Sequence, residues 1–309
     1  MAQFAPTSNA GSRMPPDTGA PSSRELPAAA DRATAVIARS AGLPAFVVIG
    51  AMKSGTSSLH HYLGQHPEIS MSRVKEPNYF IEAGNLGRGL DWYQSLFADR
   101  SKLCGEVSPS YSKRHRHRGV PERLHERVPH VKLIYLLRDP IDRIVSHYLH
   151  NRQRSRETRS LAEAVAAKSY RNNYVRTSLY HFQLSAFLGH FPLDRILIAT
   201  TEDLKERQAE TLASVFRFIG VDAGFEGSEF GRLFNRTPVA AEVPKSAETK
   251  GRAVTGIIDA ALRRLRQTAV AAPRPVLEPA DRDRLAERLA PDVERLRALT
   301  GLRFERWSL

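Results

Sequence analysis

The segment from Gly50 to Ser58 (GAMKSGTSS) has the residue types that bind phosphate or sulfate groups. It lies between an apolar run at 45–50 (AFVVIG), which predicts a buried strand, and a segment at 55–63 with helical character. A loop between a buried strand and a helix directs several backbone N–H groups, and the positive end of the helix, toward one point. We therefore expect an anion-binding loop at this place.

The position of the lysine distinguishes this loop from that of the nucleotide hydrolases. Their signature, G-x-x-x-x-G-K-[ST], places lysine directly after the second glycine. Here Thr56 follows Gly55, and Lys53 stands two residues before that glycine. Taken by itself, the segment is also compatible with an ordinary glycine turn and a capping serine.

A second polar cluster follows the strongest apolar run of the chain, 131–137 (VKLIYLL). Arg138 comes directly after this run and Ser146 eight residues later, in the pattern R-D-P-x-x-R-x-x-S-x-Y. A guanidinium forms forked, charge-assisted hydrogen bonds with phosphate, which makes Arg138 a second candidate for anion binding. The residues alone leave two alternatives: Asp139 is the magnesium-binding aspartate of a kinase, or Asp139 and Pro140 simply begin a helix.

Both clusters fit into an alternation of strands and helices. Apolar residues spaced three and four apart predict helices at 141–148 and 204–219. Such alternation is typical of an α/β fold with a parallel sheet and helices on both faces, in which ligands bind beyond the carboxyl ends of the strands. Both clusters lie at such ends. The expected strands are 45–50, 103–107, 131–137 and 195–199.

The chain divides into an N-terminal tail and one domain. Residues 1–42 hold five prolines, five serines and a single aromatic residue, which is too little apolar surface to offset the entropy of ordering. We expect this tail to be disordered and residues 43–309 to form the domain. An aperiodic stretch at 237–256 is interpreted as a lid; a basic helix at 257–267 and a charged amphipathic helix at 281–299 follow it.

Composition and charge restrict the class of protein. The chain has 309 residues, of which 41% are hydrophobic and 26% charged, as in soluble globular proteins. Its net charge of +13 attracts anionic partners. The single cysteine, Cys104, excludes an internal disulfide and no Cys/His cluster accompanies it; no apolar stretch reaches the roughly 18 residues of a membrane span. We expect a cytoplasmic protein.

The K-S-G-T-S loop and the R-D-P-x-x-R-x-x-S-x-Y pattern together resemble the donor site of sulfotransferases that use 3′-phosphoadenosine 5′-phosphosulfate (PAPS). The resemblance implies a P-loop-like three-layer domain that moves a sulfuryl group to an acceptor hydroxyl and releases 3′-phosphoadenosine 5′-phosphate (PAP), without a metal. It places Lys53 on the oxygen that bridges phosphorus and sulfur, and Arg138 and Ser146 on the 3′-phosphate. Donors to the 5′-phosphate and sulfonate would come from Ser54, Gly55, Thr56, Ser57 and Ser58.

The resemblance covers residues 45–309 and is strongest to the glycan, heparan-sulfate-type enzymes. It implies that Glu76 is the general base, with Glu106 as the alternative, and that Lys250, Gly251 and Arg252 form a loop that closes over the nucleotide. The chain departs from the 3-O type of these enzymes at Asn78, Ile81 and Val107, so the acceptor cannot be carried over.

Several alternatives remain for the acceptor and for the function. The acceptor is a glycan, a glycolipid or a small metabolite, and the basic runs 113–118 (KRHRHR) and 152–159 (RQRSRETR) are candidates for lining its cleft. Neither run contains aromatic residues that would stack on bases, which argues against single-stranded nucleic acid. A nucleotide-dependent kinase and a non-catalytic binder of anionic polymers are the other functions compatible with the sequence.

Overall fold

The computed structural model describes residues 42–167, 172–232 and 275–309. Nearly all of the expected N-terminal tail, the basic helix expected at 257–267 and the triplet Lys250, Gly251 and Arg252 lie outside the described residues. The predictions made for them stay predictions.

A five-stranded parallel sheet forms the centre of the structure, with the strand order β2-β3-β1-β4-β5. The four expected strands are confirmed, each within one residue of its predicted bounds. The short β2, which pairs with β3, is an addition that three residues gave too little pattern to predict. The strands are β1 (Phe46–Gly50), β2 (Ile69–Met71), β3 (Leu103–Val107), β4 (Lys132–Leu137) and β5 (Ile196–Thr200).

The pairing of β1 with β4 decides where the two candidate clusters lie. Val47 pairs with Leu133 and Gly50 with Tyr135, so these neighbouring strands run in the same direction and end at the same edge of the sheet. Every residue of β1, β3 and β4 is buried, which explains the nearly continuous apolar runs of β1 and β4. β3 is buried in the same way although it contains Glu106.

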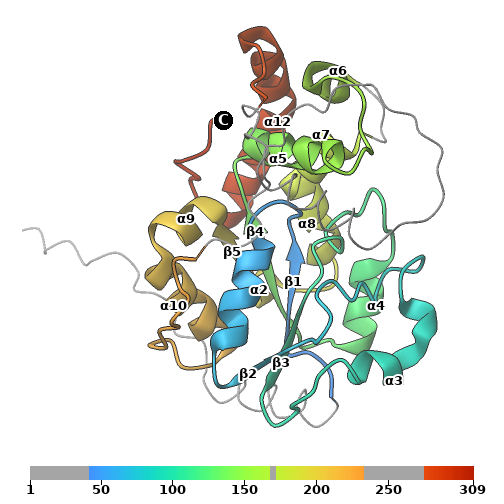
Figure 1. The fold of residues 1–309 in the computed structure, drawn as a ribbon, viewed down its shortest axis with the longest axis vertical. Coiled ribbons are helices and arrows are strands. Elements are labelled where there is room, and N and C mark those ends of the chain that lie inside the picture. Colours follow the sequence, from blue (N-terminus) through green and yellow to red (C-terminus); the bar gives the residue numbers. More distant parts are fainter. Residues whose placement is uncertain (1–41, 168–171, 233–274) are drawn as a thin grey trace, which may run out of the picture.

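Helices cover both faces of the sheet and confirm the three-layer arrangement (Figure 1). On one face, α2, α9 and α10 pack against side chains such as Val48 and Ile134. On the other, α4, α8 and α12 pack against Val47 and Leu133. The α-helices are α2 (Thr56–Gln65), α3 (Gly89–Gln94), α4 (Val120–Arg127), α5 (Pro140–Arg152), α6 (Leu161–Ala166), α7 (Asn173–Thr177), α8 (Tyr180–Leu188), α9 (Thr201–Glu206), α10 (Gln208–Ile219) and α12 (Pro279–Thr300).

A third apolar cluster joins α5, α6, α7 and α12 beyond the carboxyl ends of the strands, at the top of Figure 1. The helix α12 is the amphipathic helix expected at 281–299, and it supports α8 through a buried carboxylate. Asp292 is 2% exposed, and its two oxygens accept the backbone N–H groups of His181 and Phe182, each at 2.9 Å. Among the described residues, no helix is long and apolar enough to cross a membrane.

We expect Asp292→Ala to lower the free energy of unfolding by about 1–3 kcal/mol, because it leaves two backbone N–H groups at the start of α8 without acceptors. Chemical denaturation of the full chain measures the change. Asp283→Ala is the matched control, since Asp283 is exposed on the same helix, and it should change stability by less than about 0.5 kcal/mol. An equal loss in both variants would show that the carboxylate does not support α8.

Candidate functional site

The loop at 51–55, called the phosphate loop after the ligand expected from its sequence, leaves the end of β1 and leads directly into α2. The backbone N–H of Ala51 donates to Leu136 O of β4 at 2.6 Å, and that of Ser54 donates to Ala51 O at 3.1 Å. Gly55, at φ 84°, occupies the left-handed conformation that glycine adopts without strain, and it caps α2. The first turn of α2 contains no acidic residue, so the positive end of the helix is available to an anion.

A single threonine joins this loop to the neighbouring strand. The hydroxyl of Thr201, the first residue of α9, lies 2.6 Å from Ser54 O and 2.7 Å from Leu137 O. These two carbonyls belong to the phosphate loop and to the end of β4. Thr201 therefore holds the two parts of the candidate site at a constant separation, a role that its position in the sequence gave no sign of.

Lys53 lies in the loop with positive charge around it. Burial and the nearby cations Arg154, Arg138 and Lys75 lower its pKa to about 8, and only Glu76 acts in the opposite direction. An anion bound in the loop would compensate these charges and favour the charged form of the lysine. Lys53 also has a positive φ of 72°, a conformation that is uncommon outside glycine and concentrates at functional sites.

Arg138 lies at the end of β4, one strand away from the phosphate loop. Its Nη2 donates to Asp142 Oδ2 at 3.0 Å, while its buried Nε has no hydrogen-bond partner. The guanidinium is 15% exposed. A buried N–H without an acceptor is costly, and a phosphate oxygen is an acceptor of the right charge. The residues at this position therefore fit a bound phosphate.

The helix α5 begins as the sequence pattern predicted and carries Ser146, which is 9% exposed. Asp139 caps it, accepting the N–H of Asp142 at 2.8 Å, and Pro140 is its first residue. Asp139 also accepts the N–H of Ser308 at 2.6 Å. Both carboxylate oxygens of Asp139 thus hold the backbone, as a helix cap does.

Glu76 projects from a loop that is attached to the end of β3. Its N–H donates to Val107 O at 3.0 Å, and the N–H of Asn78 donates to Ser108 Oγ at 3.1 Å. The carboxylate is 44% exposed and accepts a hydrogen bond from Lys75 Nζ at 2.6 Å. Glu76 and Asn78 have φ values of 61° and 49°, so this loop shares with Lys53 the left-handed conformation.

Glu76 lies close enough to the cations around the phosphate loop to act on them. Burial and neighbouring cations lower the pKa values of Lys53, Lys113 and His150, and the carboxylate of Glu76 partly offsets that lowering in each case. Glu76 is therefore a candidate for receiving a proton from a substrate bound among these cations. In the described part of the chain, no group of three or more His, Cys, Asp or Glu residues could hold a metal ion.

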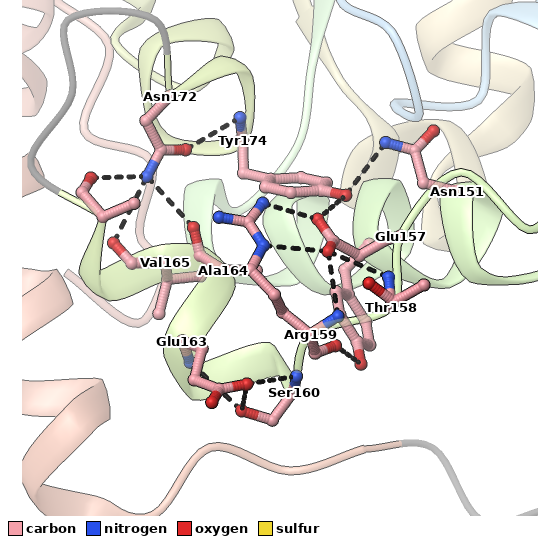
Figure 2. Close-up of polar contacts among 12 residues, drawn as sticks. Asn151, Glu157, Thr158, Arg159, Ser160, Glu163, Ala164, Val165, Asn172 and Tyr174 are labelled. Carbon is pink, nitrogen blue, oxygen red and sulfur yellow. Dashed lines mark hydrogen bonds and ion pairs between the residues drawn. The ribbon is translucent and has the colours of Figure 1, made fainter.

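The second basic run, 152–159, contains arginines that support its own loop, and Figure 2 shows the contacts of Glu157 with Arg159 and Tyr174. Glu157 is 8% exposed; it accepts from Arg159 and from the hydroxyl of Tyr174 at 3.0 Å, and these bonds hold its pKa at about 2. Arg152 donates to backbone carbonyls of the same loop. Arg154, in contrast, makes no ion pair with a described carboxylate and reaches the ring of His150 at 2.6 Å.

Comparison with known proteins identifies the family. A sequence profile described as the sulfotransferase domain matches residues 43–233. The chain belongs to the sulfotransferase domain family. The crystal structure of a sulfotransferase from Alicyclobacillus acidocaldarius superimposes with a TM-score of 0.64 at 25% identity, covering 86% of this chain and 99% of that one.

Curated relatives of this sulfotransferase domain include two human heparan sulfate enzymes. Heparan sulfate glucosamine 3-O-sulfotransferase 5 is 27% identical over 206 residues, 63% of this chain and 58% of that protein. Bifunctional heparan sulfate N-deacetylase/N-sulfotransferase 2 is 26% identical over 198 residues, 58% of this chain and 22% of that protein. The matched region thus spans little more than half of the first relative and about a fifth of the second.

The alternative base proposed from the sequence, Glu106, does not fit that role in this sulfotransferase domain. Glu106 is completely buried, and burial raises its pKa to about 8, an effect that the hydroxyls of Tyr111 and Tyr93 offset only partly. A carboxyl that is protonated near neutral pH cannot accept a proton there. The end of β3 is close to the site, but this side chain points into the aromatic core.

Arg143 is a residue of the site whose role the sequence did not reveal. It is fully buried on α5 and donates to Ser178 Oγ, to Tyr174 O and, at 3.4 Å, to Met52 O of the phosphate loop. Among the described residues it has no carboxylate within ion-pair distance, and burial lowers its pKa to about 10. Arg143 connects the helix that follows Arg138 with the loop that holds Lys53.

The buried carboxyl of Glu106 should make the stability of the wild-type chain fall as the pH rises. Its pKa is raised in the folded state, so between pH about 4.5 and about 8 the folded protein keeps a proton that the unfolded chain has released. The free energy of unfolding therefore falls as the pH rises through this range. This decline in the free energy of unfolding amounts to a few kcal/mol, and we expect it to be absent in Glu106→Gln, which has no proton to lose. Chemical denaturation of both proteins at pH 5, 6.5 and 8 measures it. If the free energy of unfolding changed with pH in the same way in both proteins, Glu106 would not titrate in this range.

Proposed function

We propose that the protein transfers a sulfuryl group from PAPS to a hydroxyl of an acceptor and releases PAP. The observation that carries the proposal is the pairing of two anion-binding positions on neighbouring strands. The phosphate loop follows β1, and Arg138, with its unpartnered Nε, follows β4. A donor with phosphate groups at both the 5′ and 3′ positions of one nucleoside would occupy both.

Each residue of the loop has a separate part in this reaction. Backbone N–H groups of the loop and of the first turn of α2, with the hydroxyls of Ser54, Thr56, Ser57 and Ser58, would bind the 5′-phosphate and the sulfonate. The ammonium of Lys53 would stabilise the charge that develops on the oxygen leaving sulfur. Arg138 and Ser146 would bind the 3′-phosphate, and Lys250, Gly251 and Arg252 would cover the nucleotide.

Glu76 is the residue that we assign as the general base. Its carboxylate is exposed enough to meet an acceptor, and its contact with Lys75 holds it beside the proposed donor site. The proton of the acceptor hydroxyl would go to Glu76 as its oxygen bonds to sulfur. No step of this scheme requires a metal.

The class of acceptor follows from the relatives and from the charge of the site. The two human relatives act, by their names, on heparan sulfate, which supports a carbohydrate acceptor such as a glycan or a glycolipid. The chain differs at Asn78, Ile81 and Val107 from the 3-O type, so a small hydroxylated metabolite stays an alternative. The cytoplasmic location expected from the sequence is likewise a prediction.

The kinase alternative loses its main support in the structure. Asp139 would have to face a magnesium ion, but both of its carboxylate oxygens accept backbone N–H groups. Thr56 also stands where a nucleotide hydrolase has its lysine. A non-catalytic binder of anionic polymers would depend on the +13 charge alone and would not distinguish among nucleotides.

Nucleotide selectivity tests the assignment of the donor. PAP at about 100 times its dissociation constant should stabilise the protein by roughly 2.7 kcal/mol and raise its melting temperature by several degrees. AMP and ATP with magnesium should protect much less, because neither offers a 3′-phosphate to Arg138. Thermal melts of the full chain with each ligand provide the measurement.

Two variants make this melting experiment specific. Arg138→Ala should abolish the difference between PAP and AMP. Arg127→Ala should preserve it, because Arg127 is exposed at the end of α4 and remote from the carboxyl edge of the sheet. Protection by ATP with magnesium equal to that by PAP would favour the kinase alternative instead.

Replacement of Glu76 tests the assignment of the base. Glu76→Gln keeps the shape of the side chain but cannot accept the proton, so we expect turnover to fall by about 10²–10⁴-fold while PAP still raises the melting temperature. Turnover is measured with labelled PAPS and a panel of hydroxylated acceptors. The control, Glu82→Gln, removes an exposed carboxylate from the same loop and should leave turnover unchanged. Similar rates in the two variants would show that another group takes the proton.

A further inference from the structure

Lys113 is the first residue of the basic run 113–118, which the sequence suggested as a lining of the acceptor cleft. Its side chain is buried instead of extending into solvent. It lies in the loop after β3 and is only 7% exposed. Its Nζ lies 2.9 Å from the sulfur of Met52, the residue that precedes Lys53 in the phosphate loop. The ammonium is thus buried against the proposed donor site.

The partner of this ammonium is an unusually poor one. A thioether sulfur is a weak hydrogen-bond acceptor, whereas an ammonium has three donors to satisfy. No described carboxylate lies within ion-pair distance of Lys113. Lys132 is equally buried, at 7% exposed, but it donates to Phe218 O at 2.6 Å, as a structural lysine does. Lys113 therefore has the position of a buried cation whose anionic partner is supplied from outside the chain.

The charged groups around Lys113 locate the place where such an anion would bind. Burial, Arg143 of α5 and Arg116 of its own loop together lower the pKa of Lys113 to about 8, and Glu76 acts in the opposite direction. His147 of α5 is near enough for Lys113 to lower its pKa as well. Glu76, the proposed base, is thus the acidic group that acts on Lys113, while the contact with Met52 holds the ammonium against the phosphate loop, so we infer that Lys113 lies between the base and the loop.

We propose that Lys113 is a further catalytic residue, whose ammonium leaves the sulfur of Met52 and binds the sulfonate that is being transferred. This assignment rests on the proposed function. In the transfer, the bond between sulfur and the bridging oxygen of the donor breaks and that oxygen leaves with the electron pair, beside Lys53. The acceptor oxygen forms the new bond to sulfur, and its proton goes to Glu76. Lys113 would stabilise the sulfonate oxygens on the acceptor side throughout, a task separate from that of Lys53.

Binding of PAPS and PAP to the full chain tests the proposal without an acceptor, because the two ligands differ in the sulfonate. The measured quantity is the ratio of the affinity for PAPS to the affinity for PAP. In Lys113→Met this ratio should be about tenfold or more lower than in wild type, while the affinity for PAP itself should change less than about threefold. Lys113→Arg should keep part of the preference. Lys132→Met, which removes an equally buried lysine far from the loop, should lower stability but leave the preference unchanged. Calorimetric titration gives all of these values.

The outcomes separate this proposal from the proposed function itself. If wild type binds neither nucleotide, the proposed function fails. If wild type binds PAPS and PAP, and Lys113→Met either weakens the two affinities by the same factor or leaves both unchanged, Lys113 does not touch the sulfonate and the proposal is overturned. Should Lys113→Met fail to fold, Lys113→Gln and Lys113→Arg answer the same question through the same ratio. With an acceptor present, turnover of the variant should fall by roughly 10²-fold.

Proton uptake gives a second measurement that a purely structural lysine would not affect. Because the sulfonate raises the pKa of the ammonium beside it, PAPS binding at pH 8 should draw protons from the buffer. Titrations in two buffers of different ionisation enthalpy measure this number. Lys113→Met should take up fewer protons than wild type, while the contribution of Lys53 persists. Equal uptake by wild type and Lys113→Met would contradict the proposal.

Discussion

The parallel pairing of β1 with β4 is the constraint on which the rest of the site depends. It brings the ends of two buried strands to one edge of the sheet, so that the phosphate loop and Arg138 lie side by side although they are far apart in the chain. The hydroxyl of Thr201 and the N–H of Ala51 then tie the loop to β4. Because both contacts are to backbone atoms, they hold the loop whatever ligand it binds.

The candidate site carries an excess of positive charge that a bound anion would compensate. Lys53, Arg138 and Arg143 lie close together, and Arg143 is buried without a described counterion. Burying these cations beside one another disfavours their charged forms in the ligand-free protein, and burial is the larger cause of the lowered pKa values of Lys53 and Arg143. Binding of the polyanionic donor that we propose would offset that cost, because its negative charges would stabilise the charged forms of these residues.

The helices beyond the carboxyl edge keep this charged site in place. Arg143 connects α5 to the phosphate loop, and Asp292 of α12 caps α8, whose Tyr180 donates to Arg138 O at 2.8 Å. Glu157 holds the loop after α5 that bears Arg154. Polar contacts of this kind have fixed geometry, unlike apolar packing, and are suited to keeping donor groups at constant positions.

The sequence by itself determined the fold class, four of the five strands and the two anion-binding motifs, because each is encoded by neighbouring residues: apolar runs, a glycine turn, and an arginine directly after a strand. Only the tertiary structure distinguishes Glu76, which is partly exposed, from Glu106, since the burial that raises the pKa of Glu106 depends on aromatic residues from other parts of the chain. The same holds for Lys113 and Arg143. Their contacts with Met52 join residues 61 and 91 positions apart, and no local pattern specifies which distant residue a side chain will meet.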